Sequence, residues 1–273
     1  MRLTSAFALF LLPSLAAAQP TYKLGVDSHV YPGAVLKLEG ARLSRGAVKD
    51  DPGFRLQFHV LKDGKSLQTK NARLEDAIDL PTKEPGDYAA VLELFYPAYK
   101  GGSETKGQFK AISPYLLYNV SAPGGPIKTL TREPALVLDC GKGDGKAQDV
   151  KLAKDYGYKL IQGKPLEGWP AAVKKHAWMD PKSVRFEIAL PKETPGTLRL
   201  LLVDGDTAGR KCKVVIQGRP LPVVADFGGP GKQVEMPLST TETKTGKIEV
   251  SIEALDKGTA VVSTVEFVPA FAK

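Results

Sequence analysis

The second half of the chain gathers aromatic and acidic residues of the kinds that contact sugars. Aromatic rings stack on the C–H faces of sugars, and carboxylates accept hydrogen bonds from sugar hydroxyls. Both tryptophans of the chain fall within residues 169–178, a stretch without regular periodicity. The candidate ligand-binding residues are Tyr156, Tyr158, Trp169, Trp178, Asp204 and Asp206. Two interpretations stay open: an exposed carbohydrate site, or rings that close the end of a hydrophobic core.

The chain has only two cysteines, Cys140 and Cys212. In an oxidising compartment they can form a disulfide, which in the chain-entropy model stabilises the fold by roughly 4 kcal/mol. The alternative is two buried thiols in strands. Sequence spacing does not give the distance between two strands, so both alternatives stay open.

Three aspartates, Asp139, Asp144 and Asp149, are evenly spaced along a segment rich in glycine and lysine. Carboxylates on a flexible loop are ligands for calcium. Lysines interrupt the segment and the EF-hand pattern is absent, which favours a solvated turn. We therefore expect no cofactor, with a structural calcium ion as the alternative.

The sequence contains no recognisable catalytic motif. Its three histidines are His29, His59 and His176. His59 falls on the polar face of its predicted strand, where we expect it to be solvated, and the lysines before His176 disfavour its charged form. There is no Gly-x-Ser-x-Gly elbow, His-Glu-x-x-His helix or phosphate-binding glycine loop. The chain is therefore predicted not to be an enzyme, although a triad assembled from distant residues stays open.

Residues 1–18 have the pattern of a cleavable signal peptide. Arg2 is followed by an apolar run from Ala6 to Leu12, and Ala16–Ala18 supply small residues for cleavage. The run is too short to span a bilayer, and no later segment reaches the roughly 18 to 20 apolar residues that a membrane helix needs. We expect a secreted or periplasmic protein without a transmembrane segment.

The charge pattern argues against a nucleic-acid partner. The formal net charge is +8, but the basic residues are spread along the chain instead of forming a stripe. A mild basic excess is compatible with an acidic polysaccharide. The pattern favours ordinary solubility charge over such a partner.

Apolar and polar residues alternate with period two along most of the chain, which indicates strands. Phe54–Val60 alternates before Asp63-Gly64, a strong hairpin turn signal, and Val184–Leu190 alternates in the second half. Residues 121–126 read Ser-Ala-Pro-Gly-Gly-Pro, which breaks both strand and helix. The predicted fold is all-β, with two β-sandwich domains in tandem: residues 19–122, a linker at 123–131, and residues 132–273.

The first half resembles immunoglobulin-like and fibronectin-III-like domains. The resemblance depends on Phe54–Val60 with its Asp63-Gly64 turn, and on Pro85-Gly86-Asp87-Tyr88 before a late strand. In such domains the tyrosine at this step can form a corner. Cysteine and tryptophan are absent from this half.

The second half is similar to galactose-binding-like jelly rolls, including malectin-like domains and carbohydrate-binding modules. The opening strand ends in Leu138-Asp139-Cys140-Gly141, the aromatic-rich segment follows, and later strands pass through Pro195-Gly196 and Val203–Asp206. The resemblance implies carbohydrate recognition through the second domain, with a polysaccharide or a cell-surface glycan as partner. The alternative is a structural or adhesive surface protein that acts by protein–protein contacts.

Overall fold

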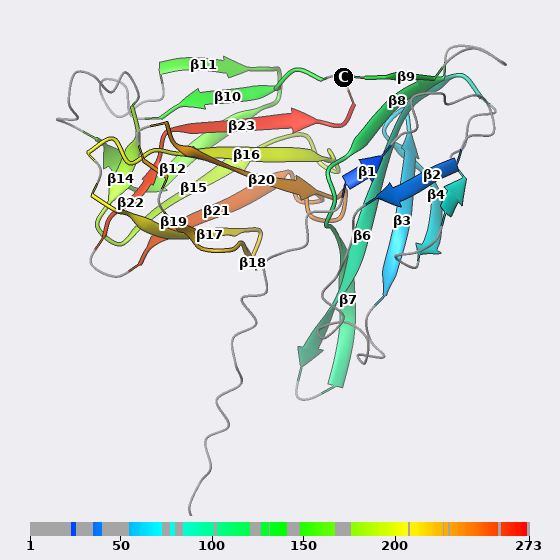
Figure 1. Cartoon of the computed structure of the whole chain (residues 1–273), viewed down its shortest axis with the longest axis horizontal. Helices are drawn as coiled ribbons and strands as arrows, with labels where there is room; N and C mark the ends of the chain where they lie inside the picture. The colour runs from blue at the N-terminus through cyan, green and yellow to red at the C-terminus, as the bar shows by residue number, and fades with distance from the viewer. Residues whose placement is uncertain are drawn as a thin grey trace, which may run out of the picture.

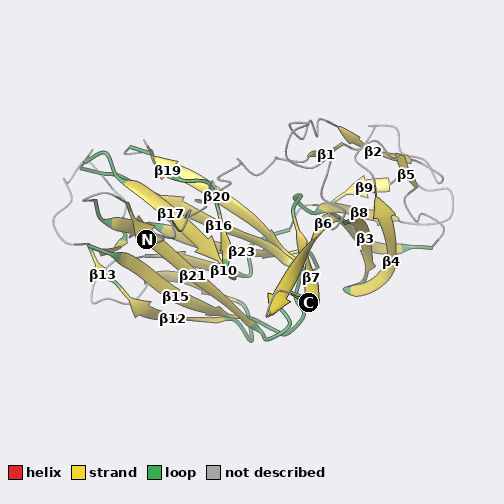
Figure 2. Cartoon of the chain, turned by 90° about the horizontal axis from the view of Figure 1, so that it is seen from below, coloured by secondary structure: helices red, strands yellow, loops and turns green. Residues whose placement is uncertain are grey.

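The structure is a computed structural model, and its described part consists of strands and connecting loops (Figures 1 and 2). It describes residues 23–25, 35–39, 55–72, 77–79, 84–100, 103–120, 127–130, 132–140, 148–166, 176–206, 208–225, 227–228, 230–255 and 258–271. The predicted signal peptide lies outside these residues. Within them, all regular elements are strands, as expected for an all-β chain. The described part contains no helix with the length and apolar character that crossing a membrane requires.

The strands of the first half pair among themselves, and we call them the first unit. A three-stranded sheet has the order β1-β2-β5, and a six-stranded sheet has the order β4-β3-β6-β8-β9, with β7 paired to β6. The strands are β1 (Lys23–Gly25), β2 (Val35–Glu39), β3 (Leu56–Lys62), β4 (Lys65–Ala72), β5 (Ala77–Asp79), β6 (Gly86–Lys100), β7 (Ser103–Ala111), β8 (Leu116–Val120) and β9 (Ile127–Thr129).

The strands of the second half form the second unit. Two of its sheets face each other across one core, with the orders β11-β10-β23-β16-β20 and β12-β15-β21-β17-β18; β19 pairs with β17, and a small third sheet has the order β13-β14-β22. The strands are β10 (Leu136–Asp139), β11 (Gln148–Leu152), β12 (Gly157–Gln162), β13 (Lys164–Pro165), β14 (Trp178–Asp180), β15 (Ser183–Ala189), β16 (Gly196–Leu202), β17 (Lys211–Ile216), β18 (Arg219–Pro220), β19 (Val224–Ala225), β20 (Lys232–Leu238), β21 (Lys247–Ala254), β22 (Ala260–Val262) and β23 (Thr264–Pro269).

Local turn chemistry sets the pairing of the first unit. Asp63 and Gly64 both have positive φ, the conformation that joins β3 to β4 in a tight hairpin. The hydroxyl of Tyr88 donates to the carbonyl of Glu84 at 2.7 Å, which is the backward hydrogen bond of a tyrosine corner. The hairpin and the corner bond expected from the sequence are therefore present. The immunoglobulin-like or fibronectin-III-like assignment itself stays a prediction.

One part of the predicted linker at 123–131 is a strand. Ile127–Thr129 forms β9, which pairs antiparallel with β8 at the edge of the six-stranded sheet. The Pro/Gly stretch at 121–126, on which the linker prediction depended, lies outside the described residues. The prediction extended too far because the free edge of β8 offers backbone partners to the chain that follows.

The second unit shows the inward and outward alternation expected of a sandwich. In β15, Val184, Phe186 and Ile188 are buried while their neighbours face outward. The same pattern recurs in β16 and β21. These side chains form one continuous core with the buried residues of the facing sheet.

The antiparallel order gives the second unit two distinct ends. β10 and β16 end, and β23 begins, at one end, which we call the free end. At the other end, β23 finishes beside the start of β16, and Ala270 packs against Leu61 and Ala89 of the first unit. We call this the docked end; in Figure 1 the first unit stands beside it, and the turn end of the β6–β7 hairpin projects away from the second unit.

A glycine at the docked end tests this packing. A Cβ on Gly196 would lie 2.5 Å from the carbonyl oxygen of Val268 and 2.6 Å from the ring of Phe267. Gly196→Ala should lower the free energy of unfolding by about 2 kcal/mol through overpacking, measured by urea denaturation. Gly157→Ala is the control, because its nearest neighbour, the Cβ of Ala189, is at 3.8 Å. Equal stability of the two variants would contradict the close approach.

Candidate functional site

The free end of the second unit carries a partly exposed pair of polar side chains, Asp139 and His176. The Nδ1 atom of His176 lies 3.4 Å from a carboxylate oxygen of Asp139. Ser263 joins the elements around them: its hydroxyl donates to the carbonyl of His176, and its backbone bonds to Cys140 and Leu201. The strands therefore deliver a carboxylate and an imidazole to one surface at the end of the sandwich.

The loop after β16 holds the predicted residues Asp204 and Asp206, and Arg210 joins them. Asp204 is buried and accepts hydrogen bonds from three successive backbone N–H groups, those of Ala208, Gly209 and Arg210. The Arg210 guanidinium contacts both carboxylates. Asp204 therefore holds the loop in shape, and of the two loop aspartates only Asp206 presents a partly exposed carboxylate.

The predicted aromatic groove is not formed by the described residues. Trp178 is 0% exposed and packs in the core against Phe186, so its ring offers no face to a sugar. Tyr158 is partly buried beside Trp178, whereas Tyr156 packs against Phe267 elsewhere on the core. The burial of Trp178 agrees with the second interpretation of this cluster, in which the rings close the end of the hydrophobic core. Trp169 lies outside the described residues.

Both cysteines are free and buried, so of the two alternatives the structure has the buried thiols and not the disulfide. Cys140 directly follows β10 of one sheet, and Cys212 belongs to β17 of the facing sheet. The Cys140 thiol is directed at the carbonyl of Leu138, and the Cys212 thiol at that of Thr259. Burial raises the pKa of both thiols, which keeps them protonated.

Of the three aspartates considered as calcium ligands, only Asp139 has a described side chain, so the calcium alternative stays a prediction. Asp139 ends β10, Asp149 belongs to β11, and Asp144 lies outside the described residues. Among the described side chains, no group of three or more His, Cys, Asp and Glu residues is close enough to hold a metal ion. At Asp204 and Asp206 the positive charge is already supplied by Arg210.

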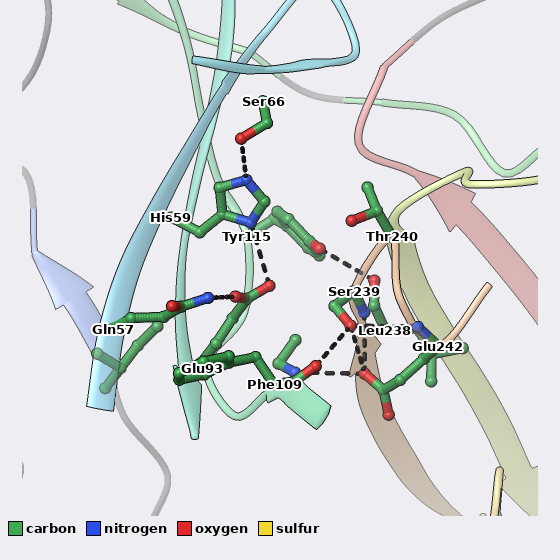
Figure 3. Close-up of polar contacts among 12 residues, drawn as sticks. Gln57, His59, Ser66, Glu93, Phe109, Tyr115, Leu238, Ser239, Thr240 and Glu242 are labelled. Atoms are coloured by element: carbon green, nitrogen blue, oxygen red, sulfur yellow. Dashed lines mark hydrogen bonds and ion pairs between the residues drawn. The ribbon is translucent and has the colours of Figure 1, made fainter. Parts of the chain in front are cut away.

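The docked end is built around a buried ion pair between Arg219 and Glu242, which we call the clamp. Figure 3 shows Glu242 with the polar contacts around it. Arg219 lies 2.9 Å from Glu242, and their side chains are 3% and 1% exposed. Both side chains hydrogen-bond to the backbone of Ala111 in the first unit. Arg219 donates to the carbonyl of Ala111 at 2.6 Å, and Glu242 accepts from its N–H at 3.3 Å. Ala111 ends β7, so the clamp satisfies the edge of that strand as a neighbouring strand would.

Further polar contacts surround the clamp. The Tyr115 hydroxyl donates to the carbonyl of Leu238 at 3.0 Å, and the Ser239 hydroxyl donates to that of Phe109 at 3.3 Å. Burial raises the pKa of Glu242, although Arg219 opposes the shift. Burial, together with the charges of Glu93 and Glu242, raises the pKa of Tyr115 well above its ordinary range. The ionised carboxylate is therefore costly, and its hydrogen bonds and Arg219 offset that cost.

Beside the clamp, His59 is not solvated as the sequence predicted. It is 8% exposed, and its Nδ1 lies 3.2 Å from Glu93, which is 3% exposed. Its Nε2 lies 2.9 Å from the hydroxyl of Ser66. Gln57 donates to the other oxygen of Glu93 at 2.5 Å. The prediction failed because it considered one strand alone, whereas the second unit covers this face of the sheet.

Sequence reasoning missed the clamp as well as the His59–Glu93 pair. Arg219 and Glu242 lie far from Ala111 in the chain, and neither has a distinctive sequence context. The Asp63-Gly64 turn was the one local signal for the surroundings of His59. A tight hairpin at this turn brings Ser66 back toward His59. That the chain is not an enzyme remains a prediction of the sequence.

Comparisons with known proteins establish no family. No family model matches the chain, and no curated protein matches it. Among solved structures, a Bacteroides uniformis β-glucuronidase aligns over 89% of this chain and 28% of its own, at 12% identity and a TM-score of 0.35. The extracellular domain of ANXUR2 from Arabidopsis thaliana aligns over 79% and 78%, at 10% identity and a TM-score of 0.38. TmCBM61, solved with β-1,4-galactotriose, aligns over 42% and 89%, at 15% identity and a TM-score of 0.28.

The loop salt bridge predicts an acid-dependent loss of stability. Its hydrogen bond to Arg210 lowers the pKa of Asp206 from 3.8 to about 2. Because the folded-state pKa is depressed, the stabilisation is present above pH 3.8 and is lost as the pH falls toward about 2. The difference in free energy of unfolding between the wild type and Asp206→Asn should shrink over this window. Parallel pH curves from chemical denaturation would contradict the pairing.

The clamp predicts a large effect of removing one partner. Glu242→Ala leaves Arg219 buried without its counter-charge and should cost about 3 to 5 kcal/mol of unfolding free energy. The double change Arg219→Met with Glu242→Leu leaves no lone charge and should cost less, although the N–H and the carbonyl of Ala111 lose their partners. Glu133→Ala is the control, since its ion pair with Lys151 is exposed and little change is expected. Chemical denaturation measures all three. A single change no more harmful than the control would exclude a buried clamp.

Proposed function

We propose that this chain is an exported binding protein and that the free end of its second unit recognises carbohydrate. The observation that carries the proposal is the partly exposed Asp139–His176 pair at that end. A carboxylate accepts and an imidazole donates hydrogen bonds, which matches the alternating donors and acceptors of adjacent sugar hydroxyls. The resemblance of residues 132–273 to galactose-binding-like jelly rolls supports the same ligand class.

The position of the first unit favours this end over the other. The docked end is covered by the first unit through the clamp and through Ala270, so it is closed to a large ligand. The free end has no such cover among the described residues, and Asp206 adds a second partly exposed carboxylate there. Loops at the end of a rigid sandwich are frequent binding positions because the scaffold fixes their side chains.

Affinity electrophoresis of the full chain against soluble polysaccharides tests the proposal. The panel should contain neutral β-1,4-galactan and xylan, together with the acidic polysaccharide polygalacturonate. Asp139→Ala and His176→Ala should each weaken binding roughly tenfold or more, since hydrogen bonds to charged groups contribute about 1.5 to 3 kcal/mol. Trp169→Ala belongs in the series because the sequence predicts a stacking role for it.

Lys192→Ala is the matched control, because Lys192 is an exposed residue at the docked end. It should bind as the wild type does. Retained binding by both Asp139→Ala and His176→Ala would place the ligand elsewhere. Absence of binding to every polysaccharide in the panel would leave the structural or adhesive alternative as the better hypothesis.

A further inference from the structure

Three side chains of the first unit have the geometry of an activated nucleophile. Ser66 on β4 lies 2.9 Å from the Nε2 atom of His59, and the Nδ1 atom of His59 lies 3.2 Å from a carboxylate oxygen of Glu93. Figure 3 shows the three in line, with the imidazole between the hydroxyl and the carboxylate. A nucleophile in reach of a base, with the base oriented by a third group, is the arrangement by which serine is activated on unrelated folds.

One of the two neutral tautomers of His59 fits this arrangement. A neutral imidazole with its proton on Nδ1 donates to Glu93 and leaves Nε2 free to accept the hydroxyl proton of Ser66. Glu93 is buried, and Gln57 holds its second oxygen at 2.5 Å, so the carboxylate is fixed in place. An imidazolium formed during reaction would be stabilised by this carboxylate.

A reaction with an external substrate requires an accessible nucleophile, and the three side chains meet this requirement. Ser66 is exposed, whereas His59 and Glu93 are buried behind it. The strand register shifts at this point: Leu61 pairs with Ser66, and Val60 pairs with Gln68, so Leu67 is inserted as a bulge. Bulges turn a side chain away from the regular pleat and are over-represented beside active sites. Leu67 is itself 47% exposed, which places an apolar surface next to the hydroxyl.

We propose that Ser66, His59 and Glu93 form a triad in which Ser66 accepts acyl groups from small carboxylic esters. The Ser66 oxygen bonds to the ester carbonyl carbon while its proton passes to Nε2 of His59. The tetrahedral adduct then breaks its bond to the alcohol, which leaves with that proton. Water attacks the acyl-serine by the same exchange, and the carboxylic acid and free Ser66 are released. No oxidant, reductant or metal ion enters the balance.

This activity is independent of the proposed carbohydrate site, because the triad belongs to the first unit and the Asp139–His176 pair to the second. It opposes the expectation from motifs that the chain is not an enzyme. Motif searches depend on fixed local spacing, whereas Glu93 reaches His59 only through the pairing of β3 with β6.

Labelling of the full chain with a fluorophosphonate, followed by peptide mass mapping, tests the proposal. The expected adduct is on Ser66. It should be absent from Ser66→Ala and form at least about a hundredfold more slowly in His59→Gln, as expected when a general base is lost.

Thr69→Ala is the matched control, since Thr69 is exposed on the same strand and pairs with His59 across the hairpin. No adduct on Ser66, or an equal rate in His59→Gln, would overturn the triad. Hydrolysis of p-nitrophenyl acetate should follow the same ranking.

Glu93 acts through His59 and is therefore a positioning residue. Glu93→Gln keeps the shape but removes the charge, so labelling of Ser66 should slow while the thermal midpoint changes much less. Glu93→Asp should restore part of the rate, which a purely structural role would not predict. Equal rates in Glu93→Gln and the wild type would remove Glu93 from the triad.

A thiol variant keeps the proposal testable if substitution of His59 prevents folding. Ser66→Cys places a thiol beside the imidazole, and Lys65→Cys places one at the adjacent exposed position, which pairs with Lys62 and not with His59. Because Cys140 and Cys212 are buried, neither should compete for iodoacetamide. Alkylation of Ser66→Cys near neutral pH should be about tenfold faster than that of Lys65→Cys, since a neighbouring base raises the thiolate fraction. Equal rates would show that His59 does not activate this position.

Discussion

The clamp between Arg219 and Glu242 is the interaction on which the rest of this structure depends. Two charged side chains leave water together, and both bind the backbone of a single residue, Ala111, in the other unit. Isolated, either charge would be too costly to bury. Together they supply the donor and the acceptor that the edge of β7 lacks. The two units are thus joined by a strand-like contact made from side chains.

The clamp also shapes the surroundings of the first unit's polar cluster. Ala111 pairs directly with Glu93 across β6 and β7, so the residue that the second unit grips is the neighbour of the buried carboxylate. Tyr115 lies between Glu93 and Glu242, whose charges both act on its hydroxyl. Docking therefore excludes water from His59 and Glu93 but leaves Ser66 exposed at the margin.

How much of this could be read from the sequence depends on how local each signal is. Alternation in Val184–Leu190 predicted β15, and Asp63-Gly64 predicted the β3–β4 hairpin, because the pattern and the turn act over a few residues. Trp178 could not be assigned, since a ring in an irregular stretch gives no sign of which face is covered. His59 was misread for a related reason: its strand alternates correctly, but a second unit covers the outer face.

A polar contact between the two units fixes their register, whereas an apolar contact does not. The apolar contact of Ala270 with Leu61 and Ala89 contributes burial, but burial is non-directional and tolerates sliding. The clamp does not allow sliding, because the backbone groups of the residues next to Ala111 point toward β6, so a shift of one residue would leave the guanidinium and the carboxylate without partners. Burial raises the pKa of Glu242, which means that its charge costs free energy in the folded state. A charge kept at that cost is better explained by the register it imposes than by net stability. Glu93 on β6 pairs with the clamped Ala111 and is buried, whereas Ser66 lies on β4, on the far side of β3 from β6, and is exposed.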